Sequence, residues 1–137
     1  DWGLSWGQEI ISELKDVARV SARHRARLCL HPSPSDTHQE MLIVMTQSAV
    51  EIPQRRTIGF DTKLVVEGRA TLNYFSEQGE FVRSTDLGGS GALYTHTCSQ
   101  EFHALTVRSP WFVFVEILKG PFDSTTTEFA TWTESHP

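Results

Sequence analysis

The sequence lacks the features that mark membrane, secreted and nucleic-acid-binding proteins. No apolar run approaches the ~18 residues that a membrane-spanning helix requires, and the first ten residues have no basic and apolar segments of a secretion signal. Lysine and arginine total 12 against 17 aspartates and glutamates, and the net charge is −5. Because phosphate contacts need a basic face, this balance argues against a nucleic-acid partner. We therefore expect a cytoplasmic protein with neither a membrane nor a nucleic-acid partner.

Cysteine is also scarce, since Cys29 and Cys98 are the only two. They form no C-x-x-C pair, which argues against a cysteine-based zinc site. A single disulfide between them is one interpretation. Two buried free thiols in a reducing cytoplasm is the interpretation that we favour.

What the chain does have suits one globular domain. Its 137 residues are 39% hydrophobic and include eight Phe, two Tyr and four Trp, enough to bury a core without covalent staples. We expect a single domain over residues 1–137. It comprises an N-terminal helix (1–20), a basic and proline-rich connector (21–40), a β-barrel (41–119) and a tail packed on the barrel (120–137).

The helix is predicted over residues 5–20. Ser5 and Gln8 match an S-x-x-Q capping box, and apolar residues then recur at spacings of three and four. The connector that follows contains the one basic cluster of this acidic chain, formed by Arg19, Arg23, His24, Arg25 and Arg27. Such arginines could bind a phosphate or carboxylate, or form a solvated turn with their stems on apolar surface.

From residue 41 onward the pattern changes to short strands without helices between them, which predicts a β-sandwich or barrel. The apolar runs at 41–46 and 111–118 are strand-like, and residues 49–52 suggest a short strand. Gly68 suits a tight turn or bulge between two strands. Ser109 and Pro110 predict a turn between two more.

Three segments carry a family resemblance: SARHRARLCLH at 21–31, SPSD with MLIVMTQSAVEIP across 33–53, and VFVEILKGPFD…EFATW at 113–132. With them the chain resembles the cupin superfamily, and more narrowly the WbuC-type cupin-fold metalloproteins. The resemblance implies a mostly β fold, a cupin double-stranded β-helix (jelly-roll) barrel with an N-terminal α-helix. It also implies a context of surface-polysaccharide (O-antigen) biosynthesis, where such relatives are found.

The resemblance also implies a place for a metal. In such cupins the first motif reads P-H-x-H, followed by an acid five residues after the second His and a Gly seven residues later. Here the same frame contains Gln54 and Arg56 at the two His positions, Asp61 at the acid and Gly68 at the glycine, and His103 matches the fourth ligand.

These replacements predict that the site has lost its metal. Arg56 stays protonated and repels a cation, while Gln54 offers only a weak carbonyl oxygen. We therefore expect no cofactor. The alternative is a divalent metal (Zn, Fe or Mn) on His103, Asp61 and Gln54. Rescue by another histidine stays open, with His24, His31, His38 and His96 as the candidates.

Without metal, the motif predicts an anion-binding pocket. An inward Arg56 would pair with Asp61 or bind a ligand carboxylate or phosphate through two hydrogen bonds. The predicted ligand-binding set is Gln54, Arg56, Asp61, His103, Glu116, Arg25 and Arg27, with Phe60, Tyr74 and Trp111 as apolar walls. Glu116 lies in an apolar strand and needs a partner such as Lys119, an arginine of the basic cluster, or a pocket edge. A purely structural Arg56–Asp61 ion pair and a hydrogen-bonded core His103 remain alternatives.

Two functions follow from this interpretation. The first is a cupin-fold protein that binds a small molecule, an anionic sugar or related ligand, with little or no metal. The alternative is a cupin enzyme, metal-dependent or acid/base, of the isomerase, epimerase or dioxygenase class, using His103 and Asp61 as catalytic candidates. A homodimer is compatible with both.

Overall fold

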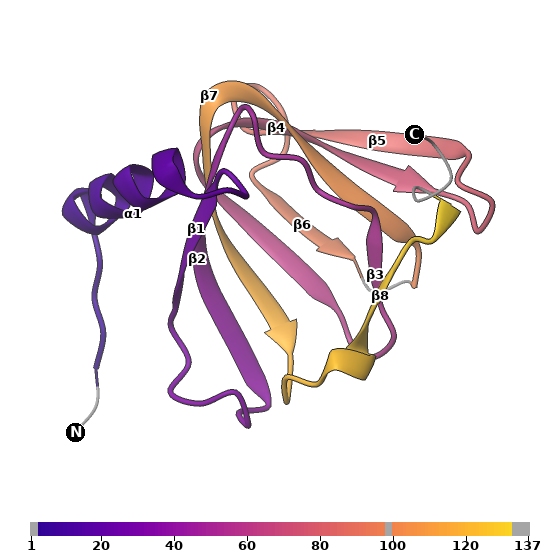
Figure 1. The fold of residues 1–137 in the computed structure, drawn as a ribbon, viewed down its shortest axis with the longest axis horizontal. Coiled ribbons are helices and arrows are strands. Elements are labelled where there is room, and N and C mark those ends of the chain that lie inside the picture. The colour runs from indigo at the N-terminus through magenta and orange to yellow at the C-terminus, as the bar shows by residue number, and fades with distance from the viewer. Residues whose placement is uncertain (1–2, 98–99, 133–137) are drawn as a thin grey trace.

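A computed structural model describes residues 3–97 and 100–132 of the chain. Within these residues, eight strands and one α-helix form a curled antiparallel sheet with the helix on its outside (Figure 1). The elements are α1 (Gln8–Val20), β1 (Arg25–Cys29), β2 (His38–Thr46), β3 (Gln54–Arg56), β4 (Asp61–Phe75), β5 (Phe81–Leu87), β6 (Tyr94–Thr97), β7 (Phe102–Lys119), a short 3₁₀ turn (Ser124–Thr126) and β8 (Thr127–Phe129). This is the mostly β, jelly-roll architecture with an N-terminal helix that the sequence predicts.

The helix begins later than predicted. Its first residue is Gln8 and its N-cap is Gly7, which provides no side-chain cap. The expected capping box is wrong, because such a box needs the serine at the N-cap and the glutamine three positions into the helix. Ser5 lies two residues outside the N-cap instead.

Helix α1 covers the outer face of β1 and β2 (left in Figure 1), and its cluster extends to β7 behind them. Its buried Ile11 and Ala18 pack against Val44 of β2 and Val113 and Val115 of β7. Alternate residues of a strand point to opposite faces, so these valines face the helix while their neighbours face inward. Alternate residues of β7 thus contribute to two apolar layers, one under the helix and one inside the barrel.

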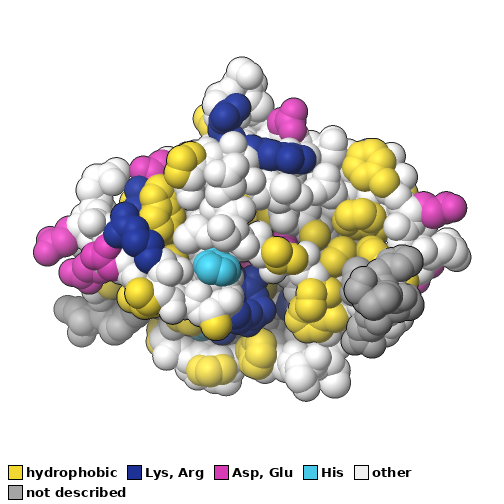
Figure 2. Space-filling view, turned by 45° about the horizontal axis from the view of Figure 1, so that its top comes forward, with side chains coloured by type: hydrophobic (Ala, Val, Ile, Leu, Met, Phe, Trp, Pro, Cys, Tyr) yellow, Lys and Arg dark blue, Asp and Glu magenta, His cyan; other side chains and the backbone are white. Residues whose placement is uncertain are grey.

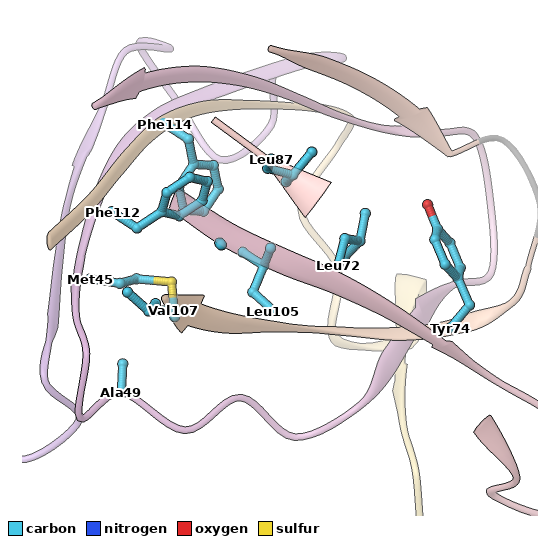
Figure 3. Packing of buried hydrophobic residues seen from close by; sticks show 10 residues of the cluster. Met45, Ala49, Leu72, Tyr74, Leu87, Leu105, Val107, Phe112 and Phe114 are labelled. Atoms are coloured by element: carbon cyan, nitrogen blue, oxygen red, sulfur yellow. The ribbon is translucent and has the colours of Figure 1, made fainter. Parts of the chain in front are cut away.

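The inner layer is the larger hydrophobic core. Phe112 and Phe114 of β7 stack with their ring centroids 5.1 Å apart, and they pack with residues of β2, β4 and β5 (Figure 3). The remaining labelled members are Met45, Ala49, Leu72, Tyr74, Leu87, Leu105 and Val107. Tyr74 lies apart from the phenylalanines in this view.

Strands β4 and β7 pair along their length and bend together. The register shifts around Gly68, whose φ is +83°. A Cβ on Gly68 would lie 1.9 Å from the carbonyl oxygen of Trp111, so the two backbones approach as only glycine allows. The glycine is therefore a bulge inside one strand, one of the two possibilities that the sequence left open.

The turn predicted at Ser109 and Pro110 is wrong, since β7 runs unbroken through both residues. A proline is tolerated there because residues 108–111 of β7 lie outside the β4–β7 ladder, which skips from Val107 to Phe112 opposite Arg69. The Ser109 hydroxyl bridges the gap: it accepts from the amide of Arg69 at 2.9 Å and donates to the carbonyl of Trp111 at 2.6 Å.

Two further expectations need correction. Residues 49–52 form no strand, and Ala49 instead packs into the inner core. Cys29 is free and exposed rather than buried, because it lies on the edge strand β1. Cys98 lies outside the described residues. Within residues 3–97 and 100–132, no helix is long and apolar enough to span a membrane.

Candidate functional site: a buried ionic cluster

The centre of the barrel holds an ionic cluster built on the start of β4. Asp61 and Lys63 are two residues apart and therefore point to the same face of the strand. Both are buried, with exposed fractions of 5% and 3%. In the β4–β7 ladder Lys63 is paired directly with Glu116, which places the two side chains next to each other. We call Asp61, Lys63, His103 and Glu116 the central cluster.

The Lys63 ammonium is the hub of the central cluster. Its Nζ lies 2.7 Å and 2.8 Å from the two carboxylate oxygens of Asp61 and 3.2 Å from Oε2 of Glu116. The Lys63 side chain is only 4% exposed, Asp61 6% and Glu116 16%. A buried ammonium with this set of acceptors has its hydrogen-bonding capacity met by the protein itself.

His103 completes the cluster from β7. Its Nε2 lies 3.0 Å from Oδ2 of Asp61, and its Nδ1 lies 3.0 Å from the carbonyl oxygen of Glu101. Both neighbours accept hydrogen bonds, so the ring can satisfy both only by donating from both nitrogens. Tyr74 packs beside it with ring centroids 6.1 Å apart and bonds through its hydroxyl to Thr97 at 3.0 Å.

The charges of the cluster depend on one another. Burial alone would disfavour the Asp61 carboxylate, but the positive charge of Lys63 and the contact with His103 outweigh it and hold the pKa of Asp61 well below its usual range. Burial likewise disfavours the Lys63 ammonium, yet the carboxylates of Asp61, Glu116 and Glu51 raise the pKa of Lys63 above its usual value. Asp61 and Lys63 are therefore both ionised at neutral pH.

The two glutamates behave differently. Burial, together with the negative charge of Asp61, raises the pKa of Glu116 to about 7 despite the contact with Lys63. Burial also raises the pKa of Glu51, with Lys63 opposing the change. Oε2 of Glu51 accepts a hydrogen bond from the amide of Leu105 at 2.6 Å. Of the three residues Asp61, Lys63 and Glu116, Glu116 is thus the one that titrates closest to neutral pH.

Arg56 does not form the predicted pair with Asp61. Its Nη2 donates to the carbonyl oxygen of Lys119 at 2.7 Å, and its Nη1 donates to the hydroxyl of Thr127 at 3.0 Å. The side chain is buried, which lowers the pKa of Arg56, and the charges of Asp61 and Glu116 oppose this from a distance. Arg56 therefore connects β3 to the ends of β7 and β8. The cation that pairs with Asp61 is Lys63 and not, as predicted, Arg56.

The other predicted residues are dispersed. Gln54 is half-buried in β3. It is the register partner of His103 in β7, so the two side chains point to the same face of the sheet. Arg25 and Arg27 lie in the edge strand β1, where Nη1 of Arg27 contacts the sulfur of Met41 at 4.0 Å. Glu116 is paired, as its apolar strand requires, but with Lys63 rather than Lys119 or the basic cluster.

The predicted aromatic walls also separate. Tyr74 borders His103, as described above. Trp111 lies under the helix, with Lys15 and Arg19 over its ring. Phe60 packs on His96 with centroids 5.1 Å apart, and Nδ1 of His96 bonds Thr62, a residue on the face of β4 opposite to Asp61. Of the four rescue histidines, His96 therefore faces away from the cluster.

The residues at the centre do not fit a metal ion. Both oxygens of Asp61 are bound to the Lys63 ammonium, and one of them is also bound to His103. Within residues 3–97 and 100–132, no group of three His, Cys, Asp or Glu side chains is arranged to hold a metal. An ammonium in the middle of the donors excludes a second cation by charge and by volume.

Reasoning from the motif overlooked Lys63 and Glu51. The signal for Lys63 is strand alternation, because any strand that points Asp61 inward also points Lys63 inward. Glu51 carries no such signal, since it lies in an irregular segment before Pro53.

Two hollows lie on the surface rather than at the cluster. A depression of about 450 Å³ is lined by Arg55, Phe75, Ser76, Glu77, Gln78, Val82, Gln100, Glu101 and Phe102. A second, of about 380 Å³, lies at the β1–β2 connection. In Figure 2 hydrophobic side chains gather at the right-hand end of the molecule, where Figure 1 places β5, and Phe81 and Val82 of β5 are 62% and 53% exposed.

Comparison with known proteins now adds a family and a fold. A family described as a domain of unknown function, DUF6016, matches residues 6–87. The chain belongs to this family. No curated protein matches its sequence. Further information on this DUF6016 protein comes from solved structures with a similar fold.

Three of the solved structures that are similar to this DUF6016 protein illustrate the likeness. The protein SO0799 from Shewanella oneidensis has 13% identity and a TM-score of 0.59, with 77% of this chain and 68% of that chain covered. CapF, bound to the inhibitor 3-isopropenyl-tropolone, has 13% identity and a TM-score of 0.66 over 80% and 33%. Oxalate decarboxylase from Bacillus subtilis has 16% identity and a TM-score of 0.60 over 82% and 29%.

These structures share the cupin-type fold of this chain, which spans about a third of CapF and less of the decarboxylase. The decarboxylase contains Mn(II) centres. At such low identity the likeness concerns the fold alone.

Proposed function

We propose that this DUF6016 protein is a cupin-fold binding protein that needs no metal and takes a small polar ligand, a sugar or an anionic sugar derivative. The observation that carries the proposal is the Lys63 ammonium at 2.7–3.2 Å from the carboxylates of Asp61 and Glu116. Groups that neutralise one another in a buried cluster are unsuited to metal chemistry. They are equally unsuited to abstracting a proton from a bound substrate.

The depression around Arg55 is the ligand site that we favour. Phe75 and the exposed Val82 supply apolar surface for the C–H face of a sugar ring. Gln78 supplies an amide group for hydroxyls, and Gln100, whose Nε2 donates to the carbonyl oxygen of Thr57 at 3.1 Å, supplies its amide oxygen. Its volume of about 450 Å³ is in the range of small-molecule sites. The WbuC-type resemblance, with its surface-polysaccharide context, supports the same ligand class.

Arg55 is suited to the anionic group of such a ligand. Its guanidinium lies 4.5 Å from the centroid of the Phe102 ring and pairs with Glu77 and Glu128. Those two carboxylates are 64% and 49% exposed, and exposed ion pairs contribute only about 0–1 kcal/mol. A ligand carboxylate or phosphate can therefore displace one of them and bind Arg55 through two hydrogen bonds.

The test is a thermal-shift and calorimetric titration of the purified protein with uronic acids, sugar phosphates and nucleotide sugars, in the presence of EDTA. We expect a rise in Tm with at least one anionic sugar, since binding at 100 times Kd adds about 2.7 kcal/mol of stability. The Arg55→Ala variant should lose the shift. The matched control is Arg83→Ala, because Arg83 also stacks on an aromatic ring and pairs with a glutamate but does not line the depression.

Two results would count against this function. One is a wild-type Tm that no sugar moves. The other is near-stoichiometric Zn, Fe or Mn in protein purified without chelator, which would refute its metal independence.

The contact between Asp61 and His103 favours the alternative, an acid/base enzyme. The 3.0 Å distance suits proton exchange between the two groups, but their side chains are 6% and 3% exposed and neither lines the two depressions. Turnover of a sugar nucleotide that His103→Ala abolishes, while the variant stays folded, would establish the alternative.

A further inference from the structure

The Lys63 ammonium lies where several oxygen donors converge, deep inside the protein. We propose that this ammonium fills a built-in cation site, and that the same side chains bind a divalent metal ion once the amine is removed. The inference depends on the metal independence proposed above, but not on the ligand. It concerns what the barrel centre is able to bind and which side chain prevents it.

The first argument is geometric. Three carboxylate oxygens, two from Asp61 and one from Glu116, lie 2.7, 2.8 and 3.2 Å from a single nitrogen atom. Metal–oxygen distances for Mg²⁺, Mn²⁺ and Ca²⁺ are roughly 2.0–2.6 Å. An ion at the Nζ position would need the oxygens to close by about 0.5–1 Å, a movement within reach of side-chain rotation.

The second argument is the support behind these donors. His103 contacts Oδ2 of Asp61 at 3.0 Å, and its other nitrogen is fixed by the carbonyl oxygen of Glu101. An imidazole that orients a ligating carboxylate is the kind of outer partner found around protein metal sites. One oxygen of Asp61 therefore has a second partner besides Lys63.

The third argument is charge. Asp61 and Glu116, with Glu51 close enough to affect the pKa of Lys63, form a negative centre that needs a counter-cation. Lys63 supplies this cation from within the chain. A free divalent ion would have to displace an ammonium that is covalently tethered at 4% exposure, so the wild-type protein excludes the ion while it stays folded.

The experiment compares wild type with Lys63→Ala, which leaves room for an ion and its waters. Each protein is purified in EDTA, equilibrated with Mn²⁺ or Co²⁺, gel-filtered and analysed for bound metal and for Tm. We expect near-stoichiometric metal and a metal-dependent rise in Tm for Lys63→Ala, and neither for wild type. Bound Co²⁺ should also give a visible absorption band that is absent from wild type.

The controls separate this site from adventitious binding. Lys119→Ala removes an exposed lysine of the same charge and should gain no metal. Adding Asp61→Asn to Lys63→Ala should abolish binding, and adding His103→Gln should weaken it about 10–100-fold if His103 orients the ligand.

Three outcomes would overturn the inference: a folded Lys63→Ala that takes up no metal, metal uptake by Lys119→Ala to the same extent, or uptake by wild type with Lys63 in place. The last outcome would also refute the proposed metal independence, whereas the first two would leave it standing. If Lys63→Ala folds neither with nor without Mn²⁺, the titration is repeated on Lys63→Gln. This variant keeps most of the side-chain volume and adds a neutral amide oxygen, and no metal uptake by folded Lys63→Gln would equally overturn the inference.

Discussion

Lys63 provides the positive charge at the centre of the central cluster. An unpaired ammonium in a protein interior is costly, yet here its partners are two carboxylates that are themselves buried. The stability of each member of the central cluster therefore depends on the others. Removing one charge is expected to cost more than removing a matched pair.

Lys63→Met keeps the apolar stem but removes the charge. We expect it to lower the free energy of unfolding by about 3–5 kcal/mol, because Asp61 and Glu116 are left without their counter-charge. Adding Asp61→Asn should restore part of this loss. Lys15→Met, which breaks a partly exposed ion pair with Glu67, should cost less than about 1 kcal/mol. Urea denaturation measures all four proteins, and equal losses for Lys63→Met and Lys15→Met would contradict the prediction.

Glu116 is expected to make stability depend on pH. Its folded pKa of about 7 exceeds the ordinary value of 4.5, so the folded state binds the proton more tightly than the unfolded state. The resulting stabilisation is present below pH 4.5 and is lost as pH rises to about 7, on the order of 3 kcal/mol. Asp61 acts oppositely, since its lowered pKa removes stability only as pH falls below its ordinary 3.8.

Urea denaturation of wild type and Glu116→Gln at pH 5 and pH 8 tests this. The amide cannot titrate, so only wild type should lose stability between pH 5 and pH 8. The free energy of unfolding of Glu116→Gln minus that of wild type should therefore be larger at pH 8 than at pH 5. A difference between the two proteins that is the same at both values would show that Glu116 does not titrate in this range.

At the scale of elements, the paired bend of β4 and β7 positions the cluster. Gly68→Ala is expected to be strongly destabilising, by about 3 kcal/mol or more, because the residue has a positive φ and its Cβ would meet backbone at 1.9 Å. Gly89→Ala is the matched control. It has a φ of +59° but meets only the Arg69 side chain, at 3.0 Å, and should cost about 1 kcal/mol. Thermal unfolding of the two variants decides, and similar Tm values would contradict the argument.

The sequence predicts an element well when the residues that determine it are close together in the chain, and poorly when they belong to distant segments. Strand periodicity and the cupin resemblance suffice for the jelly-roll fold and for its outer helix. The continuity of β7 through Pro110 could not be foreseen, because it depends on a break in pairing with a distant strand: residues 108–111 of β7 face only Arg69 of β4. Arg56 was misplaced for a similar reason. A motif frame gives spacing along the chain, but the acceptors that capture its guanidinium belong to Lys119 and Thr127, more than 60 residues away.

At the scale of the whole molecule, α1 covers only part of the outer sheet face. Leu64 of β4 pairs with Val115 under the helix and with Tyr94 of β6, so these residues share one face. Beyond the helix, Leu64, Val66 and Tyr94 are 46%, 37% and 57% exposed. These residues continue, on the uncovered part of the sheet, the apolar face that the helix covers elsewhere.

We propose that a second copy of the chain covers Leu64, Val66 and Tyr94 in a homodimer. Light scattering at increasing concentration should give twice the mass of the chain, and Leu64→Glu with Tyr94→Glu should return the monomer mass. Phe81→Glu, an equally exposed apolar residue on β5, is the control and should leave the dimer intact. A wild-type protein that is monomeric at every concentration would refute the proposal.

The tethered ammonium has a consequence for how the protein is made. A barrel that needs a metal is finished only after an ion of the right kind has been acquired, in competition with more abundant or tighter-binding ions. Here the central cation is translated with the chain, at position 63. Under the metal independence proposed above, the interior is complete as soon as folding ends, whatever the cell's supply of trace elements.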